Sequence, residues 1–252
     1  MTAPSLRVLV LQHLPVEHPG TVGARLREGG CELATVELDH GEPIGDLDAF
    51  DLMVVMGGPM DVWDEDGHPW LRPEKEAIRR WVRELERPFL GICLGHQLLA
   101  DALGGAVDPM PAPEVGLAPV HVTEAGGDDP LLFGLPSPLC GLQWHGSEVT
   151  RLPMGAVTLA TNETCAVQAF RVGDRAWGLQ FHVEVGQDTV AEWASVPTYR
   201  EALAGAGVDE DGFASAVAER LAPMERLSAT ITERFMAAAD RTAALDGPGS
   251  RR

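Results

Sequence analysis

Three uninterrupted apolar runs constrain the fold more than any other feature of the chain. They occupy residues 6–12, 51–56 and 88–92, and each has the length of a strand that is buried on both faces. A further strand is expected at residues 32–38, and helices are expected at 21–28, 73–86 and 94–103. Strands that alternate with helices favour an open α/β fold, in which helices flank a mostly parallel sheet with right-handed crossovers.

The pattern changes after Gly105. Short strands are predicted at residues 117–123, 157–161, 166–172 and 176–181, and the last two read as a hairpin joined by residues 173–175. This smaller antiparallel section is followed by helical patterning from Gln187 onward. We therefore expect one domain over residues 1–186 and a helical C-terminal extension over 187–252, packed on the same domain and ending in a frayed tail.

Charge and cysteine usage exclude several classes of protein. The 19 basic and 38 acidic residues leave a formal net charge of −19, which argues against nucleic acid or an anionic membrane surface as a partner. No apolar stretch has the length of a membrane span, and the N-terminal residues do not have the pattern of a signal peptide. The 4 cysteines form no CxxC pair, which favours a reducing cytoplasm and predicts neither a zinc site nor a disulfide framework.

Cys93 lies between two glycines at the junction of an expected strand and helix. The sequence GICLG has the form of a nucleophile elbow, with cysteine in the position that serine often holds. Such a turn strains the nucleophile's backbone and leaves no room for side chains two residues away on either side. The thiol would stand at the carboxyl end of a strand and at a helix N-terminus, which favours thiolate. The alternative interpretation is a buried structural cysteine with incidental glycines.

Two further segments support a nucleophile. The glycines at 57 and 58 follow the third expected strand, where a backbone N–H of this loop and that of Leu94 could form an oxyanion hole. His182 and Glu184 end the hairpin strand, and residues two apart in an extended chain face the same side. A histidine base oriented by a carboxylate would complete a Cys93–His182–Glu184 triad.

Taken together, these motifs resemble the class I glutamine amidotransferases, and in particular the glutaminase part of GMP synthase. The matching segments are MGGPMDV, GICLGHQLLADALGG, WHGSEV and GLQFHVE, in family order over most of residues 5–185. The resemblance implies a thiol-dependent glutaminase that needs no metal and no organic cofactor. It implies Cys93 as nucleophile, His182 and Glu184 as its partners, Gly58 and Leu94 as backbone donors, and Gln97 as a substrate-binding residue.

The sequence departs from the family pattern at two positions. Val183 stands where the family usually has proline, which shapes the backbone but performs no chemistry, and Ser147 stands where it usually has an acid. Other histidines compete for the role of base. His96 is expected to be structural, and His145 is the second choice because no acid lies two residues after it.

The use of the released ammonia stays open. The chain contains neither an SGGxDS-type loop nor a GxxxxGK[ST] sequence, so no fused ATP-dependent synthetase is expected. The first hypothesis is a glutaminase that supplies ammonia to a separate synthetase. The second is a stand-alone hydrolase or peptidase of γ-glutamyl compounds. The third is a non-catalytic regulatory or binding domain that kept the fold.

Overall fold

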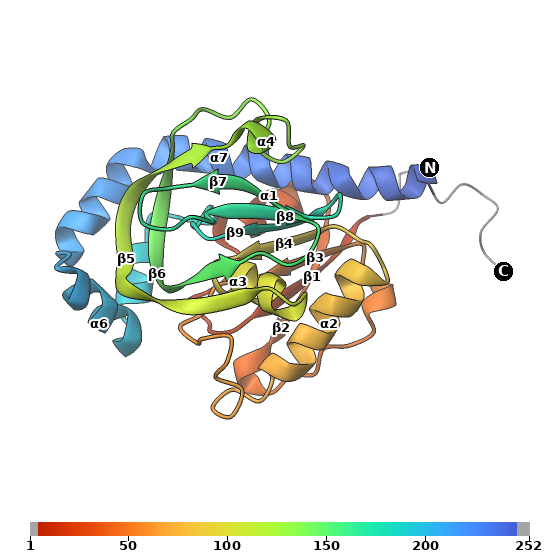
Figure 1. Cartoon of the computed structure of the whole chain (residues 1–252), viewed down its shortest axis with the longest axis horizontal. Helices are drawn as coiled ribbons and strands as arrows, with labels where there is room; N and C mark the ends of the chain where they lie inside the picture. Colours follow the sequence, from red (N-terminus) through yellow and green to blue (C-terminus); the bar gives the residue numbers. More distant parts are fainter. Residues whose placement is uncertain (1–4, 246–252) are drawn as a thin grey trace.

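A nine-stranded sheet forms the centre of the computed structural model, which describes residues 5–245 (Figure 1). The strand order is β2-β1-β3-β4-β9-β8-β7-β5-β6. The strands are β1 (Arg7–Gln12), β2 (Glu32–Glu37), β3 (Leu52–Val55), β4 (Phe89–Ile92), β5 (Ala106–Val122), β6 (Leu139–Arg151), β7 (Ala156–Thr161), β8 (Ala169–Val172) and β9 (Ala176–Leu179).

The sheet has a parallel and an antiparallel half. Strands β2, β1, β3, β4 and β9 pair in parallel, so their carboxyl ends meet at one edge. Strands β8, β7, β5 and β6 continue the sheet with antiparallel pairing, and β8 and β9 form the expected hairpin. The predicted α/β class, with its parallel sheet and smaller antiparallel section, is confirmed.

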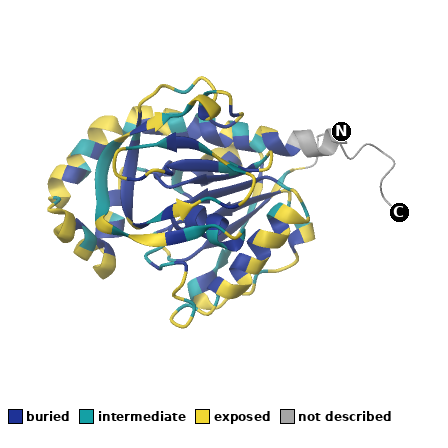
Figure 2. Cartoon of the chain, in the orientation of Figure 1, coloured by how far each residue is buried: buried dark blue, intermediate teal, exposed yellow. Residues whose placement is uncertain are grey.

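Helices cover both faces of the sheet. Figure 2 shows that the central strands are buried, whereas the helices around them are partly exposed. Alternate residues of β1 divide between the faces: Val8 and Val10 join a core with α1 and α7, whereas Leu9 and Leu11 join one with α2 and α3. The helices are α1 (Gly20–Glu28), α2 (Leu71–Arg83), α3 (Leu94–Ala102), α4 (Glu124–Gly127), α5 (Thr189–Ala194), α6 (Pro197–Ala206) and α7 (Glu210–Leu245), besides the 3-10 turns η1 (Leu38–His40) and η2 (Leu47–Ala49).

The prediction for residues 106–151 was incomplete. β5 spans Ala106–Val122 rather than only 117–123, and β6 was not predicted at all. The prolines in β5 argue against a strand, so its first half was not predicted. The register of β5 with β6 shifts between Pro109 and Glu114. β6 lacks a simple alternation because it turns Gln143 and His145 into the interior, where both are buried.

The C-terminal helices pack on the sheet and on each other. Ile231 and Phe235 of α7 enter the core that includes α1, and Trp193 of α5 and Tyr199 of α6 enter a third cluster with Trp144 of β6. The division at residue 186 stays a prediction, and the predicted frayed tail, residues 246–252, lies outside the described residues.

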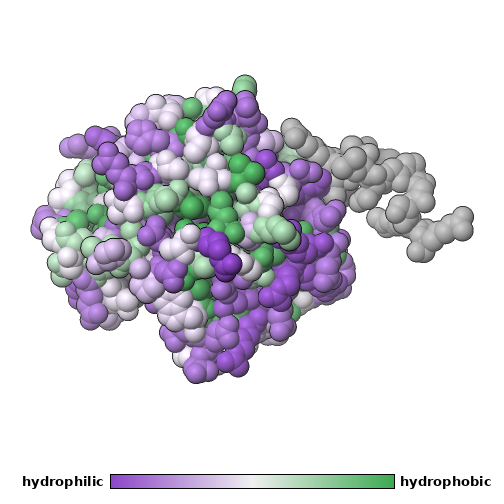
Figure 3. Space-filling view, viewed as in Figure 1, coloured by the Kyte–Doolittle hydropathy of each residue, from purple (hydrophilic) through white to green (hydrophobic). Residues whose placement is uncertain are grey.

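The outer surface agrees with the acidic composition. Hydrophilic side chains dominate the visible face over α2, while apolar groups gather nearer its centre (Figure 3). No helix within residues 5–245 has both the length and the apolar character that crossing a bilayer requires.

Candidate active site

Cys93 occupies a strained bend between β4 and α3. Its backbone angles are φ 52° and ψ −103°, outside the regions that non-glycine residues usually adopt. The two neighbouring glycines are required by close approach: a Cβ on Gly95 would collide with the carbonyl oxygen of Val55, and one on Gly91 with that of Gly95. The sequence therefore uses glycine twice so that the chain can turn sharply at the cysteine.

The bend places Cys93 at the N-terminus of α3 and almost out of solvent. The side chain is 5% exposed, and its Sγ lies 3.9 Å from the carbonyl oxygen of Trp144. Leu94 is the first residue of the helix, so its N–H has no acceptor within the helix. The helix terminus thus offers a backbone donor and a positive dipole end beside the sulfur.

His182 and Glu184 meet as a buried pair beside Cys93. Nδ1 of His182 lies 2.7 Å from Oε1 of Glu184, and Oε2 of Glu184 accepts the Val183 N–H at 2.9 Å. Burial by itself lowers the pKa of His182, but Glu184 and then the Cys93 sulfur, which is hydrogen-bonded to the imidazole, raise this pKa well above 6.5. The arrangement favours an imidazolium that faces the Cys93 sulfur.

Glu17 is a second buried carboxylate at this site, and sequence reasoning missed it. It follows β1, packs against the backbone of Gly57 and accepts a hydrogen bond from the hydroxyl of Tyr199 in α6. Burial raises the pKa of Glu17, while His182 and the Tyr199 hydrogen bond oppose that rise. The C-terminal helices therefore touch the site, because α5 also places Trp193 with its ring centroid 4.4 Å from that of His182.

A cavity of about 230 Å³ opens over Cys93. Gly58 and residues after it form one wall, β6 forms another, and α6 covers part of the rim. The lining side chains include Asp61, Gln97, Trp144, Ser147 and Tyr199. The structure thus brings Gly58, Cys93 and Gln97 to one pocket, and His182 and Glu184 adjoin it through the contact of His182 with Cys93.

Gln97 is held firmly at the pocket wall. Its amide nitrogen donates to the carbonyl oxygen of Ser147 at 2.9 Å and to Oε1 of Gln180 at 3.1 Å. Ser147 in turn donates its hydroxyl to Oδ1 of Asp61 at 2.7 Å. The acid that the family pattern leads one to expect at position 147 is thus replaced by a serine that is hydrogen-bonded to a carboxylate from another loop.

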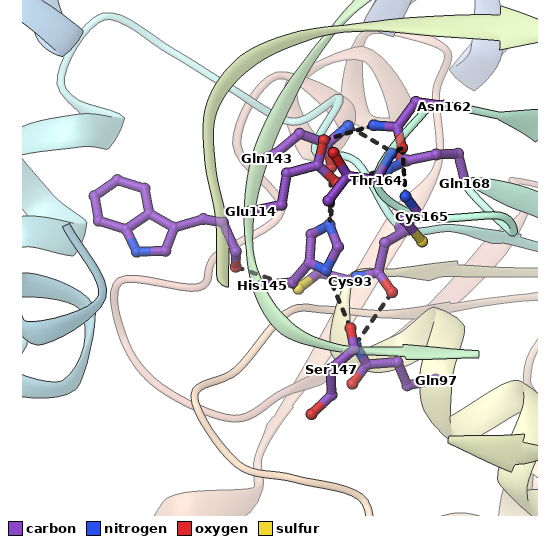
Figure 4. A network of polar contacts seen from close by, with 12 residues as sticks. Cys93, Gln97, Glu114, Gln143, His145, Ser147, Asn162, Thr164, Cys165 and Gln168 are labelled. Atoms are coloured by element: carbon purple, nitrogen blue, oxygen red, sulfur yellow. Dashed lines mark hydrogen bonds and ion pairs between the residues drawn. The ribbon is translucent and has the colours of Figure 1, made fainter. Parts of the chain in front are cut away.

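His145 is committed to a buried polar network (Figure 4). Its Nδ1 lies 3.0 Å from the carbonyl oxygen of Ser147, and its Nε2 lies 3.2 Å from both Oε1 of Gln143 and Oε2 of Glu114. Both ring nitrogens therefore face acceptors. No acid lies two residues after His145, but β5 supplies Glu114 from the neighbouring strand.

The ring of His96 is enclosed in the core against β8 and β9. It is fully buried, and its ring packs edge-on against Phe170 at 4.8 Å between centroids. Burial lowers the pKa of His96 to about 3. A neutral, enclosed imidazole of this kind is structural.

One group of potential metal ligands converges within the described part of the chain. The ligand atoms of Glu17, His182 and Glu184 lie within 4.8 Å of one another. Hydrogen bonds already engage Nδ1 of His182, both oxygens of Glu184 and one oxygen of Glu17. These atoms therefore already form the hydrogen-bond network that surrounds His182.

Comparison with known proteins identifies relatives over most of the chain. The model of the class-I glutamine amidotransferase family matches residues 21–191. One of the subunits of the glutamine-hydrolysing GMP synthase of Sulfolobus acidocaldarius is 37% identical over 154 residues, covering 61% of this chain and 77% of that protein. The glutamine amidotransferase-like protein YfeJ of Salmonella typhimurium is 33% identical over 189 residues, covering 73% and 78%.

The fold has a close solved counterpart. The crystal structure of a glutamine amidotransferase from Thermotoga maritima superposes with a TM-score of 0.83 at 30% sequence identity. The superposition covers 92% of this chain and 99% of that one. The C-terminal helices therefore fall mostly within the matched structure.

Proposed function

This chain belongs to the class-I glutamine amidotransferase family, and we propose that it hydrolyses the side-chain amide of glutamine through Cys93, His182 and Glu184. One observation carries the proposal. A strained cysteine at a helix N-terminus opens onto a cavity and lies against a histidine that a buried carboxylate orients. This combination meets the geometric requirements for an activated thiol nucleophile.

The first half of the reaction is an acyl transfer to sulfur. The Cys93 thiolate attacks the carbon of the γ-carboxamide, and the carbonyl electron pair moves to oxygen. The N–H groups of Gly58 and Leu94 bind that oxyanion. Protonated His182 then gives its proton to the leaving nitrogen, and ammonia departs as the C–N bond breaks. A glutamyl thioester stays on Cys93.

The second half restores the enzyme. Neutral His182 removes a proton from water, which attacks the thioester carbon, and glutamate leaves as the C–S bond breaks. Glu184 holds the imidazole in orientation through its 2.7 Å hydrogen bond to Nδ1. Gln97, fixed on the cavity wall, contacts the amino-acid end of the substrate. His182 performs every proton transfer in this scheme.

The ammonia is passed, in this proposal, to a separate synthetase. The support is the similarity to a protein that is named as one of the subunits of GMP synthase. A second candidate is a hydrolase of other γ-glutamyl amides. The hydrogen-bonded pair of Ser147 and Asp61 favours it, because this pair alters the wall where the family pattern has an acid.

A substrate profile tests the proposal. Ammonia release from glutamine and amine release from γ-glutamyl peptides are measured with the purified chain and with Cys93→Ser. We expect turnover of glutamine that disappears in Cys93→Ser. Faster cleavage of γ-glutamyl peptides than of glutamine would favour the second candidate. No turnover of either substrate, with Cys93 unreactive, would contradict both and favour a binding domain.

A further inference from the structure

His13 lies directly behind the peptide that joins Gly57 to Gly58. It follows β1, is fully buried, and its Nδ1 lies 2.8 Å from the carbonyl oxygen of Gly57. Because a carbonyl oxygen only accepts, Nδ1 carries the proton and donates it. On the other side of the ring, Nε2 lies 2.9 Å from Oε1 of Glu74, which is also fully buried.

The strand order decides which way this peptide points. In a trans peptide the C=O and the N–H project in opposite directions. β1 and β4 are the two neighbours of β3, and the 57–58 peptide follows β3. His13 at the end of β1 therefore draws the Gly57 carbonyl to one side, which turns the Gly58 N–H toward Cys93 at the end of β4.

We infer that His13 and Glu74 are positioning residues that hold the Gly57–Gly58 peptide with the Gly58 N–H directed at the reacting carbonyl. The inference rests on the proposed function, in which this N–H is one of two oxyanion donors. It adds a pair of residues that the triad does not contain and that come from β1 and α2. Neither residue contacts the substrate, because both are enclosed behind the loop.

The imidazole of His13 holds the peptide as a positively charged hydrogen-bond donor. Burial by itself lowers the pKa of His13, but Glu74 and the hydrogen bond to Gly57 raise it above its ordinary value. Glu74 lies in the first turn of α2, with its Oε1 against Nε2 of His13. A protonated imidazole donates at both nitrogens, and a hydrogen bond from a cation is stronger than one from a neutral donor.

The peptide needs this hydrogen bond because Gly57 and Gly58 are both glycine. Glycine peptides reorient at little steric cost, so the loop sequence itself does not select one orientation. A flipped peptide would present the Gly57 carbonyl, instead of an N–H, to the developing oxyanion. Losing one such donor typically lowers kcat by about 10²–10³-fold.

The test separates oxyanion binding from nucleophile reactivity. His13→Leu removes both hydrogen bonds, whereas His13→Asn retains a donor near the Nδ1 position. Glu74→Gln removes the charge behind the ring. The control is His40→Leu, because His40 is an exposed histidine that follows β2 and is bonded to Glu37, and not to the Gly57–Gly58 peptide. For each variant the kcat and KM for glutamine, the alkylation rate of Cys93 by iodoacetamide and the Ki of glutamate γ-semialdehyde are measured.

The aldehyde forms a tetrahedral adduct on Cys93 and therefore needs the oxyanion hole, whereas alkylation does not. We expect His13→Leu to lower kcat by about 10²–10³-fold and to raise Ki by a similar factor. KM and the alkylation rate should stay near the wild-type values. His13→Asn should recover much of the loss, Glu74→Gln should show matched smaller changes in kcat and Ki, and His40→Leu should resemble the wild type.

Two outcomes would overturn the inference. One is a wild-type kcat and Ki in His13→Leu beside an active wild-type chain. The other is an alkylation rate that falls in parallel with kcat, which would mean general disruption of the site. If His13→Leu does not fold, an unchanged Ki in the Glu74→Gln variant would overturn the inference instead. Inactivity of the wild-type chain itself would instead contradict the proposed function.

Discussion

Replacing His96 should change how stability depends on pH. The imidazole is enclosed between Phe170 and the backbone of Gly178, where a Cβ would come within 2.8 Å of Nδ1. Burial lowers its pKa from 6.5 to about 3. Between these values the unfolded chain binds a proton that the folded chain does not, so stability is lost as the pH falls below 6.5.

The magnitude follows from the width of that window. Each pH unit below 6.5 costs about 1.4 kcal/mol, so at about pH 4.5 His96 removes roughly 2.7 kcal/mol. A typical domain has about 5–15 kcal/mol of stability, so the effect is readily measured. His13 and His182 do not interfere, because their raised pKa values keep them protonated in the folded chain below pH 6.5.

Urea unfolding of the wild type and of His96→Leu, each near pH 7 and near pH 4.5, measures the difference. The comparison uses the change in unfolding free energy between the two pH values, so a constant cost of the substitution cancels. We expect the wild type to lose about 2–3 kcal/mol more than His96→Leu. Equal losses would mean that His96 is protonated within the folded chain, and the structural assignment would be wrong.

Three further predictions concern the elbow and the triad. Gly95→Ala should destabilise the fold by about 3 kcal/mol or more, because its methyl group would collide with the carbonyl oxygen of Val55. Gly205→Ala in α6 should not, because no atom lies within 4 Å of the added methyl group. Equal denaturation midpoints for the two variants would contradict the steric argument. His182→Asn should lower ammonia release by about 10⁴-fold or more, while His145→Asn should keep substantial activity; the reverse order would mean that the base is misassigned. Brief iodoacetamide treatment should modify Cys93 before the other three cysteines, as mapped by peptide mass, and an unmodified Cys93 beside a labelled neighbour would contradict its reactivity.

The parallel half of the fold was predictable because its residues obey local rules. Continuous apolar runs mark β1, β3 and β4, and GICLG marks the bend at Cys93. β6 was missed because Gln143 and His145 are polar but buried, and part of their hydrogen bonding comes from other strands. Glu114, for example, reaches His145 from β5, and no spacing rule within β6 can find it.

The residues behind the loop were missed for a different reason. His13 and Glu17 follow β1, and the motifs that indicated function lie elsewhere, after β3, β4 and β9 and in β6. The carboxyl ends of neighbouring parallel strands meet at one edge, so the same rule applied to β1 would have selected both residues. Glu74 and Tyr199 gave no local signal, because their roles depend on how α2 and α6 pack.

Trapping the covalent intermediate would show whether Cys93 is the nucleophile. The purified chain is mixed with glutamine, quenched in acid within the steady state, and digested for peptide mass analysis, beside Cys93→Ser treated in the same way. We expect a glutamyl group in thioester linkage on Cys93, and neither adduct nor ammonia with Cys93→Ser. Ammonia release by Cys93→Ser at the wild-type rate, or a glutamyl adduct on another residue, would contradict this expectation.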